Sequence, residues 1–139
     1  MIQRFESEED LRRERRAIEL FVNTFGGSYK KLDPNDIDYK VFDKDNNLIA
    51  YVEVKGRIRT MREAYPLPIS ARKFIKLADK MLNPVIIWAC EDGIIYVKAN
   101  KLVGTVRWGG RAPRANSYDD NEFMLYFEKQ KCMKYIRFT

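Results

Sequence analysis

The spacing of the apolar positions changes along the chain, and each spacing predicts a different element. Over residues 7–24 the apolar side chains recur at helical intervals, so we expect an amphipathic helix that Gly26 and Gly27 bring to an end. A second helix is expected over 71–82, with Ser70 as its N-cap. The run 85–90 is apolar throughout, which is typical of a central strand covered on both faces.

Short segments of strand character occupy much of the remaining chain. Two of them flank a polar turn and predict a β-hairpin, whereas Pro66 and Pro68 predict an irregular stretch before the second helix. The expected strands, with the hairpin as the second and third of them, lie at 28–32, 37–42, 48–55, 85–90, 94–97, 103–108, 123–127 and 135–138.

This order of elements predicts the fold class. A helix, three strands, a second helix and a further strand indicate an α/β sandwich of the order αβββαβ, in which helices flank a central mixed sheet. The length of 139 residues suits a single domain, with its core over about 7–98 and a β-rich C-terminal extension over about 99–139.

Charged side chains interrupt the apolar pattern of the predicted hairpin. They are Asp38 on its first strand, and Glu53 and Lys55 on its second. A two-residue turn within 45–47 places Asp38 opposite either Glu53 or Lys55, depending on which pair of residues is central. Either register puts the three charged side chains on one face of the sheet, whereas a three-residue loop would break this alignment.

Two carboxylates and a lysine on one face match the needs of phosphodiester hydrolysis. Mg²⁺ prefers oxygen ligands, and it is held in proteins by one or two carboxylates together with water and substrate phosphate. A bound ion lowers the pKa of a water molecule, and a nearby lysine can orient or deprotonate that water. The pattern therefore indicates a metal-dependent nuclease. The alternative interpretation is an exposed strand face that carries ordinary alternating charges.

The first predicted helix contains a glutamate within its apolar stripe. Glu14 lies about 40° from Ile18 around the helix axis, whereas Glu19 lies about 100° away, near the edge of the stripe. A carboxylate in that position requires a partner. The partner is either the metal site or the lysine that serves it, or else an arginine. Glu19 is the alternative to Glu14 as the helix carboxylate.

Composition narrows the chemistry further. The chain has no histidine, which excludes histidine-based catalytic triads and histidine–metal nuclease sites. Its two cysteines, Cys90 and Cys132, are widely separated and are expected to be buried free thiols. No stretch approaches the ~20 apolar residues of a membrane span, and the charged start of the sequence has no signal-peptide core, so we expect a cytoplasmic protein without membrane association.

The net charge of +6 suits a polyanionic partner. Basic side chains follow the hairpin, line the second helix and lie in a glycine-containing loop with aromatic neighbours, where they can contact phosphates while rings stack on bases. The alternative interpretation of that segment is a long polar surface loop without a role in binding. The expected nucleic-acid contacts are Arg57, Arg59, Lys73, Lys76, Arg111 and Arg114.

The combination of these residues resembles the PD-(D/E)XK nuclease superfamily. The stretch from Glu14 to Leu20 is similar to the first helix of archaeal Holliday junction resolvases, and the superfamily also includes small phage nucleases. The resemblance implies that Asp38, Glu53 and the carbonyl of Val54 bind Mg²⁺ or Mn²⁺, that Lys55 serves the attacking water, and that Glu14 completes the catalytic set.

The resemblance also has one departure and further implications. Ile37 stands where the superfamily often has proline, and Asp36 is a possible substitute for Asp38 as a ligand. Proteins of this size in the superfamily often form homodimers. We therefore expect a Mg²⁺-dependent endonuclease acting on duplex or branched DNA. The alternative functions are a non-catalytic nucleic-acid-binding module on the same fold, or an interaction protein whose charges only face solvent.

Overall fold

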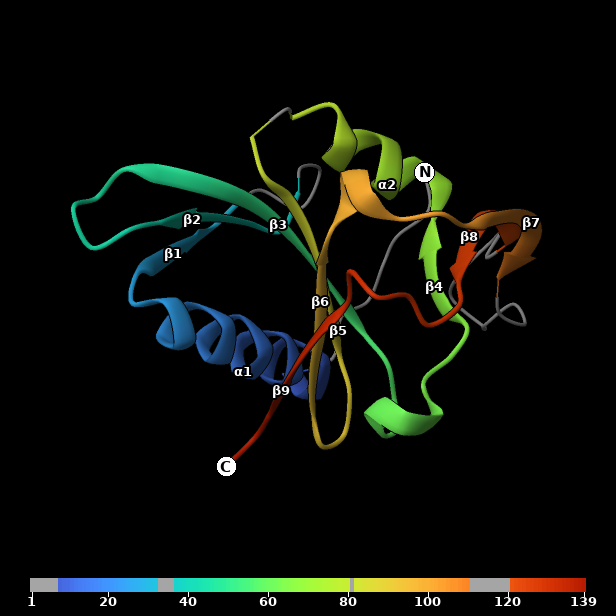
Figure 1. Ribbon diagram of the computed structural model, residues 1–139, viewed down its shortest axis with the longest axis horizontal. Coiled ribbons are helices and arrows are strands. Elements are labelled where there is room, and N and C mark those ends of the chain that lie inside the picture. The colour runs from blue at the N-terminus through green and yellow to red at the C-terminus, as the bar shows by residue number, and fades with distance from the viewer. Residues whose placement is uncertain (1–7, 33–36, 81, 111–120) are drawn as a thin grey trace.

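The computed structural model describes residues 8–32, 37–80, 82–110 and 121–139 (Figure 1). Its larger sheet has six strands in the order β1-β2-β3-β5-β6-β9. Strands β3 and β5 run parallel, and the other neighbouring pairs are antiparallel, so the expected mixed α/β sheet is confirmed. The strands are β1 (Ser28–Lys31), β2 (Tyr39–Phe42), β3 (Leu48–Gly56), β5 (Pro84–Ala89), β6 (Gly93–Lys98) and β9 (Lys134–Arg137).

A second, three-stranded sheet has the order β4-β8-β7. It consists of β4 (Leu67–Ser70), β7 (Thr105–Gly110) and β8 (Asn121–Phe127). The prediction that proline makes this stretch irregular is wrong, because β4 is an edge strand and an edge strand tolerates a residue that lacks an N–H group. The indole nitrogen of Trp88 in β5 donates a hydrogen bond to the carbonyl oxygen of Pro68 at 2.9 Å, which ties β4 to the larger sheet.

Strand β4 also corrects the predicted order αβββαβ, since a fourth strand precedes the second helix. The β-rich C-terminal residues are divided between the two sheets: β7 and β8 pair with each other and with β4, whereas β9 pairs with β6. Two short 3-10 helices, η1 (Met61–Glu63) and η2 (Ala99–Lys101), lie in the connections.

Both predicted helices are present. Helix α1 (Glu8–Phe25) ends at Gly26, whose φ of +74° favours glycine and whose N–H donates to the carbonyl of Val22 at 2.8 Å. Helix α2 (Ala71–Ala78) begins at the expected cap, because the Ser70 hydroxyl accepts a hydrogen bond from the N–H of Lys73. It is four residues shorter than the predicted 71–82, since the chain must leave the helix to enter β5 at its first residue, a proline.

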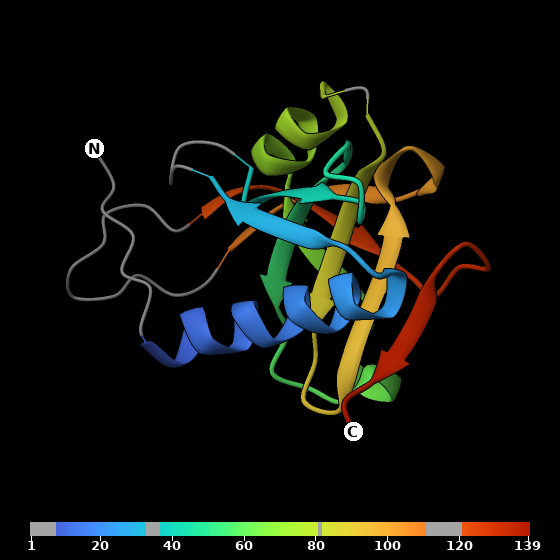
Figure 2. The same ribbon diagram turned by 90° about the vertical axis from the view of Figure 1, so that its left-hand side faces the viewer.

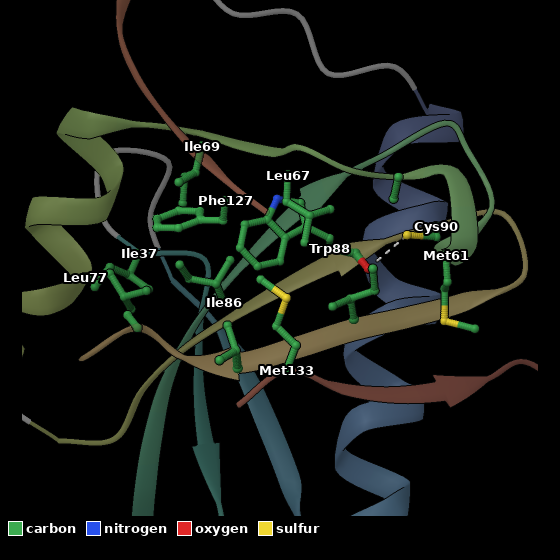
Figure 3. Packing of buried hydrophobic residues seen from close by; sticks show 14 residues of the cluster. Ile37, Met61, Leu67, Ile69, Leu77, Ile86, Trp88, Cys90, Phe127 and Met133 are labelled. Carbon is green, nitrogen blue, oxygen red and sulfur yellow. Dashed lines mark hydrogen bonds between the residues drawn. The ribbon is translucent and has the colours of Figure 1, made fainter. Parts of the chain in front are cut away.

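The two faces of the larger sheet bury separate apolar clusters. Helix α1 crosses one face, over β3, β5 and β6 (Figure 2). The opposite face packs against α2 and the second sheet, where Trp88, Phe127 and Leu67 lie together (Figure 3). Every residue of β5 is buried, which confirms the prediction of a central strand. Of the two free thiols, that of Cys90 is buried and that of Cys132 is only half-buried.

No helix within the described residues is long and apolar enough to cross a membrane.

Candidate active site

The hairpin of β2 and β3 is longer at its turn than predicted. Five residues, 43–47, connect the strands instead of the expected two-residue turn, and Asn46 among them has a φ of +65°. The side chain of Asp43 organises the turn, because its Oδ1 accepts the backbone N–H groups of Asp45 and Asn47 at 2.9 Å each. The hairpin therefore closes on a local network of hydrogen bonds around Asp43.

A β-bulge corrects the register that this odd-numbered turn sets. Phe42 pairs with Leu48 next to the turn, whereas Val41 pairs with Ala50, so Ile49 is an extra residue on β3. The pairing then continues regularly, with Tyr39 opposite Val52. Without the bulge the next residue, Asp38, would align with a core valine. With the bulge it aligns with Glu53, as one of the two predicted registers requires.

Asp38 lies immediately before β2, where the two strands separate, and its carboxylate replaces a backbone partner there. Its Oδ2 accepts a hydrogen bond from the N–H of Val54 at 2.8 Å. Within a strand, the N–H and C=O groups of one residue point to the same side. The carbonyl of Val54 therefore also points toward the end of β2, beside Asp38.

Glu53 is the most deeply buried acid of the hairpin, with 3% of its surface exposed. Its Oε2 lies 3.3 Å from the ammonium nitrogen of Lys73, which comes from the first turn of α2. Lys55 follows two residues later on the same face of β3 and is half-buried. The structure thus brings together, at one end of the hairpin, the three residues that the sequence predicted to share one face of the sheet: Asp38, Glu53 and Lys55.

Glu14 reaches the same region from α1. Its Oε1 accepts hydrogen bonds from the ammonium group of Lys31 at 2.5 Å and from the hydroxyl of Tyr39 at 2.7 Å. Only 11% of its side chain is exposed, whereas Glu19 is exposed and bonds to the hydroxyl of Tyr29 at 3.0 Å. The helix carboxylate that faces the candidate site is therefore Glu14, and its ion-pair partner is Lys31, neither the arginine nor the site lysine that were the alternatives.

The three acids repel one another. The pKa of Asp38 rises from its ordinary value of 3.8 to about 8, chiefly because the group is buried, and further because the charges of Glu53 and Glu14 are close. The Val54 hydrogen bond and the ammonium of Lys73 act in the opposite direction. Burial and the bond to Glu14 likewise raise the pKa of Tyr39. Such repulsion is what a bound cation would relieve.

The side chains of the described residues form no ready cluster of three acid, cysteine or histidine ligands. The donor set nevertheless fits a hard divalent ion, because Mg²⁺ needs only one or two carboxylates and completes its shell with water and phosphate oxygens. Asp38, Glu53 and the Val54 carbonyl offer oxygen donors only, and the charges of Glu53 and Glu14, which help to raise the pKa of Asp38, are ones that a bound cation would offset.

The predicted nucleic-acid contacts lie in different settings. Arg57 donates to the carbonyls of Ala64 and Pro66, at 2.8 and 3.4 Å, so its guanidinium braces the loop before β4. Arg59 and Lys76 are exposed. Lys73 is bonded to Glu53 inside the candidate site. Three further candidates from the sequence lie outside the described residues: Asp36, Arg111 and Arg114.

Sequence reasoning missed the partners of the acids. Tyr39 and Lys31 hold Glu14, and Lys73 holds Glu53, although none of these pairings was expected. One signal was available for Lys73. It stands three residues after the Ser70 cap, in the first turn of the helix that comes after the hairpin in the sequence. The partners of Glu14 depend on how α1 packs over β1 and β2, which no local pattern reveals.

Comparison with known proteins agrees with this geometry. The chain matches, over residues 1–134, the family model described as phage putative PDDEXK endonuclease. It has no significant match among curated proteins or among solved structures. The match confirms the resemblance to the PD-(D/E)XK superfamily, and the matched family is one of phage proteins. It gives no support to a similarity with the Holliday junction resolvases. The chain therefore belongs to this family of phage PDDEXK endonucleases.

Proposed function

We propose that this protein is a divalent-metal-dependent endonuclease that hydrolyses phosphodiester bonds in DNA. The observation that carries the proposal is the 2.8 Å hydrogen bond from the Val54 N–H to Asp38. It locks the carboxylate of Asp38 at the point where β2 and β3 separate, beside the segment of β3 that carries Glu53 and Lys55. Membership of the phage endonuclease family supports the same conclusion.

Asp38, Glu53 and the carbonyl oxygen of Val54 would hold the ion, Mg²⁺ or Mn²⁺. When bound, the ion activates water and neutralises charge on the phosphate oxygens. The protein's own contribution is to fix these oxygens before substrate arrives. The backbone of β3 positions two of the three donors, and the hydrogen bond from that same backbone orients the third.

Lys55 and Glu14 act beside these ligands. Lys55 is half-buried on the face that carries Glu53, where its ammonium group can orient the attacking water and donate to a phosphate oxygen. Glu14 is held rigidly by Lys31 and Tyr39. Its charge contributes to the raised pKa of Asp38, so its carboxylate acts electrostatically on the proposed metal ligands.

DNA approaches a protein of net charge +6, which favours association at low salt. Arg59 and Lys76 are exposed, as side chains that contact phosphates must be. Arg57 contributes differently, since its guanidinium already donates to two carbonyls, and its effect on DNA binding would come through the loop that it braces.

The test is a cleavage panel with the purified full chain. Plasmid, linear duplex, branched and single-stranded DNA are incubated with Mg²⁺, Mn²⁺ or EDTA, and the products are separated on gels. We expect cleavage with metal only, and its loss in Asp38→Asn and Lys55→Met. Asp45→Asn, an exposed acid in the hairpin turn, and Lys98→Met, an exposed lysine at the end of β6, are matched controls that keep activity.

Absence of cleavage on every substrate would refute the proposal. Salt-dependent DNA binding without metal binding would instead favour the non-catalytic module on the same fold. Preference for the branched substrate would indicate a structure-selective enzyme, for which no other support exists. The homodimer implied by the resemblance stays a prediction, and sedimentation of the purified chain tests it.

A further inference from the structure

The carboxylate of Glu53 already has a cationic partner in the metal-free protein. Its side chain is only 4% exposed, and its Oε2 lies 3.3 Å from the ammonium nitrogen of Lys73. A buried carboxylate without compensation is strongly unfavourable. The positive charge of Lys73 therefore stands where a bound divalent ion would also have to place its charge.

The position of Lys73 is set by the connection between β4 and α2. The end of β4 leads directly into α2, and the buried hydroxyl of Ser70 fixes the backbone of Lys73 by accepting its N–H at 3.2 Å. Strand β4 is itself tied to β5 by the hydrogen bond from Trp88 to Pro68. Trp88 is paired in register with Lys55. The first turn of α2 is thus anchored to the same part of the larger sheet that carries Glu53.

Lys73 also affects the neighbouring acid, since its charge lowers the pKa of Asp38. A single ammonium group therefore pairs with Glu53 and also acts, more weakly, on Asp38, the second carboxylate that is proposed to bind metal. Its side chain remains 26% exposed, so it has room to move toward solvent.

We propose that Lys73 is the resident cation of the metal site: it holds Glu53 while the protein is metal-free and is displaced when a divalent ion binds. This inference rests on the proposed function, because it presumes that Glu53 is a metal ligand. It makes Lys73 a positioning residue that preserves the oxygen donors and competes with the ion. The nucleic-acid contact expected of Lys73 from the sequence stays a separate prediction.

If Lys73 competes with the metal ion for Glu53, Lys73→Met should lower the stability of the metal-free protein but raise its affinity for metal. Without the ammonium group the metal-free protein is less stable, because Glu53 loses its partner. Metal binding becomes tighter, because the ion no longer has to break an ion pair. The ion pair of Glu53 and Lys73 is neither fully exposed nor fully buried, so its strength should lie between those of surface and buried ion pairs. We therefore expect Lys73→Met to have about a tenfold lower dissociation constant for Mn²⁺. Its melting temperature in EDTA should be lower by roughly 5 °C.

The experiment measures Mn²⁺ and Mg²⁺ binding by calorimetry, and thermal unfolding in EDTA and in saturating Mn²⁺. The proteins are the wild type, Lys73→Met, Glu53→Gln and the double variant, with Lys98→Met as the matched control. We expect Lys73→Met to bind metal more tightly and to recover wild-type melting when metal is saturating. In the Glu53→Gln background, the Lys73→Met substitution should destabilise the metal-free protein less than it does in the wild type. The double-variant comparison also covers the case in which Lys73→Met alone fails to fold.

Unchanged or weaker metal binding in Lys73→Met, while the wild type binds metal and cleaves DNA, would overturn this inference and leave the proposed function intact. Equal destabilisation by Lys73→Met in the presence and absence of Glu53 would overturn it as well. A wild type that binds no metal would overturn both proposals together.

Discussion

The carboxyl group of Asp38 makes the stability of the metal-free protein depend on pH, and one amide substitution should remove that dependence. Asp38→Asn replaces a single oxygen by an NH₂ group and keeps a carbonyl oxygen that can accept the Val54 N–H. The substitution therefore removes the charge and its titration while the hydrogen bond that positions the side chain is preserved.

The direction in which stability changes with pH follows from the raised pKa of Asp38. Asp38 titrates at about 8 in the folded protein and near its ordinary value of 3.8 when unfolded. Between these values the folded state holds a proton that the unfolded state has lost, so stability is greatest below the lower pKa and falls as pH rises toward the upper one. One proton corresponds to a slope of at most about 1.4 kcal/mol per pH unit. Above pH 8 the contribution is constant.

The assay is urea denaturation at pH 5, 6, 7 and 8 in EDTA, a range above the titration of ordinary carboxyl groups. We expect the free energy of unfolding of the wild type to fall by about 1 kcal/mol per pH unit between pH 5 and 7, and that of Asp38→Asn to change little. Asp45→Asn, the exposed turn acid, should retain the wild-type slope. Equal slopes in the wild type and in Asp38→Asn would refute the burial and charge repulsion on which this prediction depends.

Further substitutions test the roles of Lys55, Glu14 and Arg57. Lys55→Met should lower the rate of plasmid cleavage by about 10²–10⁴-fold without changing metal affinity by calorimetry, and weaker metal binding would contradict its role beside the water. Glu14→Gln should reduce cleavage in the same assay, whereas Glu19→Gln should not. Loss of cleavage in Glu19→Gln alone would instead identify the exposed Glu19 as the helix carboxylate of the site. Arg57→Ala should lower the free energy of unfolding in urea by about 1–3 kcal/mol, because the loop before β4 loses its brace, and a DNA-binding defect without loss of stability would contradict this.

Much of the fold could be read from local patterns. Continuous apolar character identified β5, helical spacing identified α1, and Ser70 and Gly26 marked helix ends, because each of these signals depends on backbone geometry and burial within one segment. Strand β4 escaped detection, since two prolines within a few residues argue against a strand unless it lies at an edge. Only the pairing of β4 with β8, far along the chain, makes it one.

The candidate site shows the same division. Parity along the hairpin predicted that Asp38, Glu53 and Lys55 share a face, and they do, although the reasoning assumed a two-residue turn. A five-residue turn and the extra residue Ile49 together restore the alignment. The position of a bulge depends on packing across the sheet, so two deviations cancelled in a way that turn propensity alone could not reveal.

The sequence by itself determined the acids and the lysine of the hairpin, because side-chain alternation along a strand is a property of the local backbone. It also determined that Glu14 lies within the apolar stripe of its helix. The tertiary structure decided which side chains hold these acids: Lys31 and Tyr39 for Glu14, and Lys73 for Glu53. Those contacts join residues 17 to 25 positions apart, and they arise only when helices pack on a sheet, since the charge of a buried acid is compensated by whichever element the fold brings beside it.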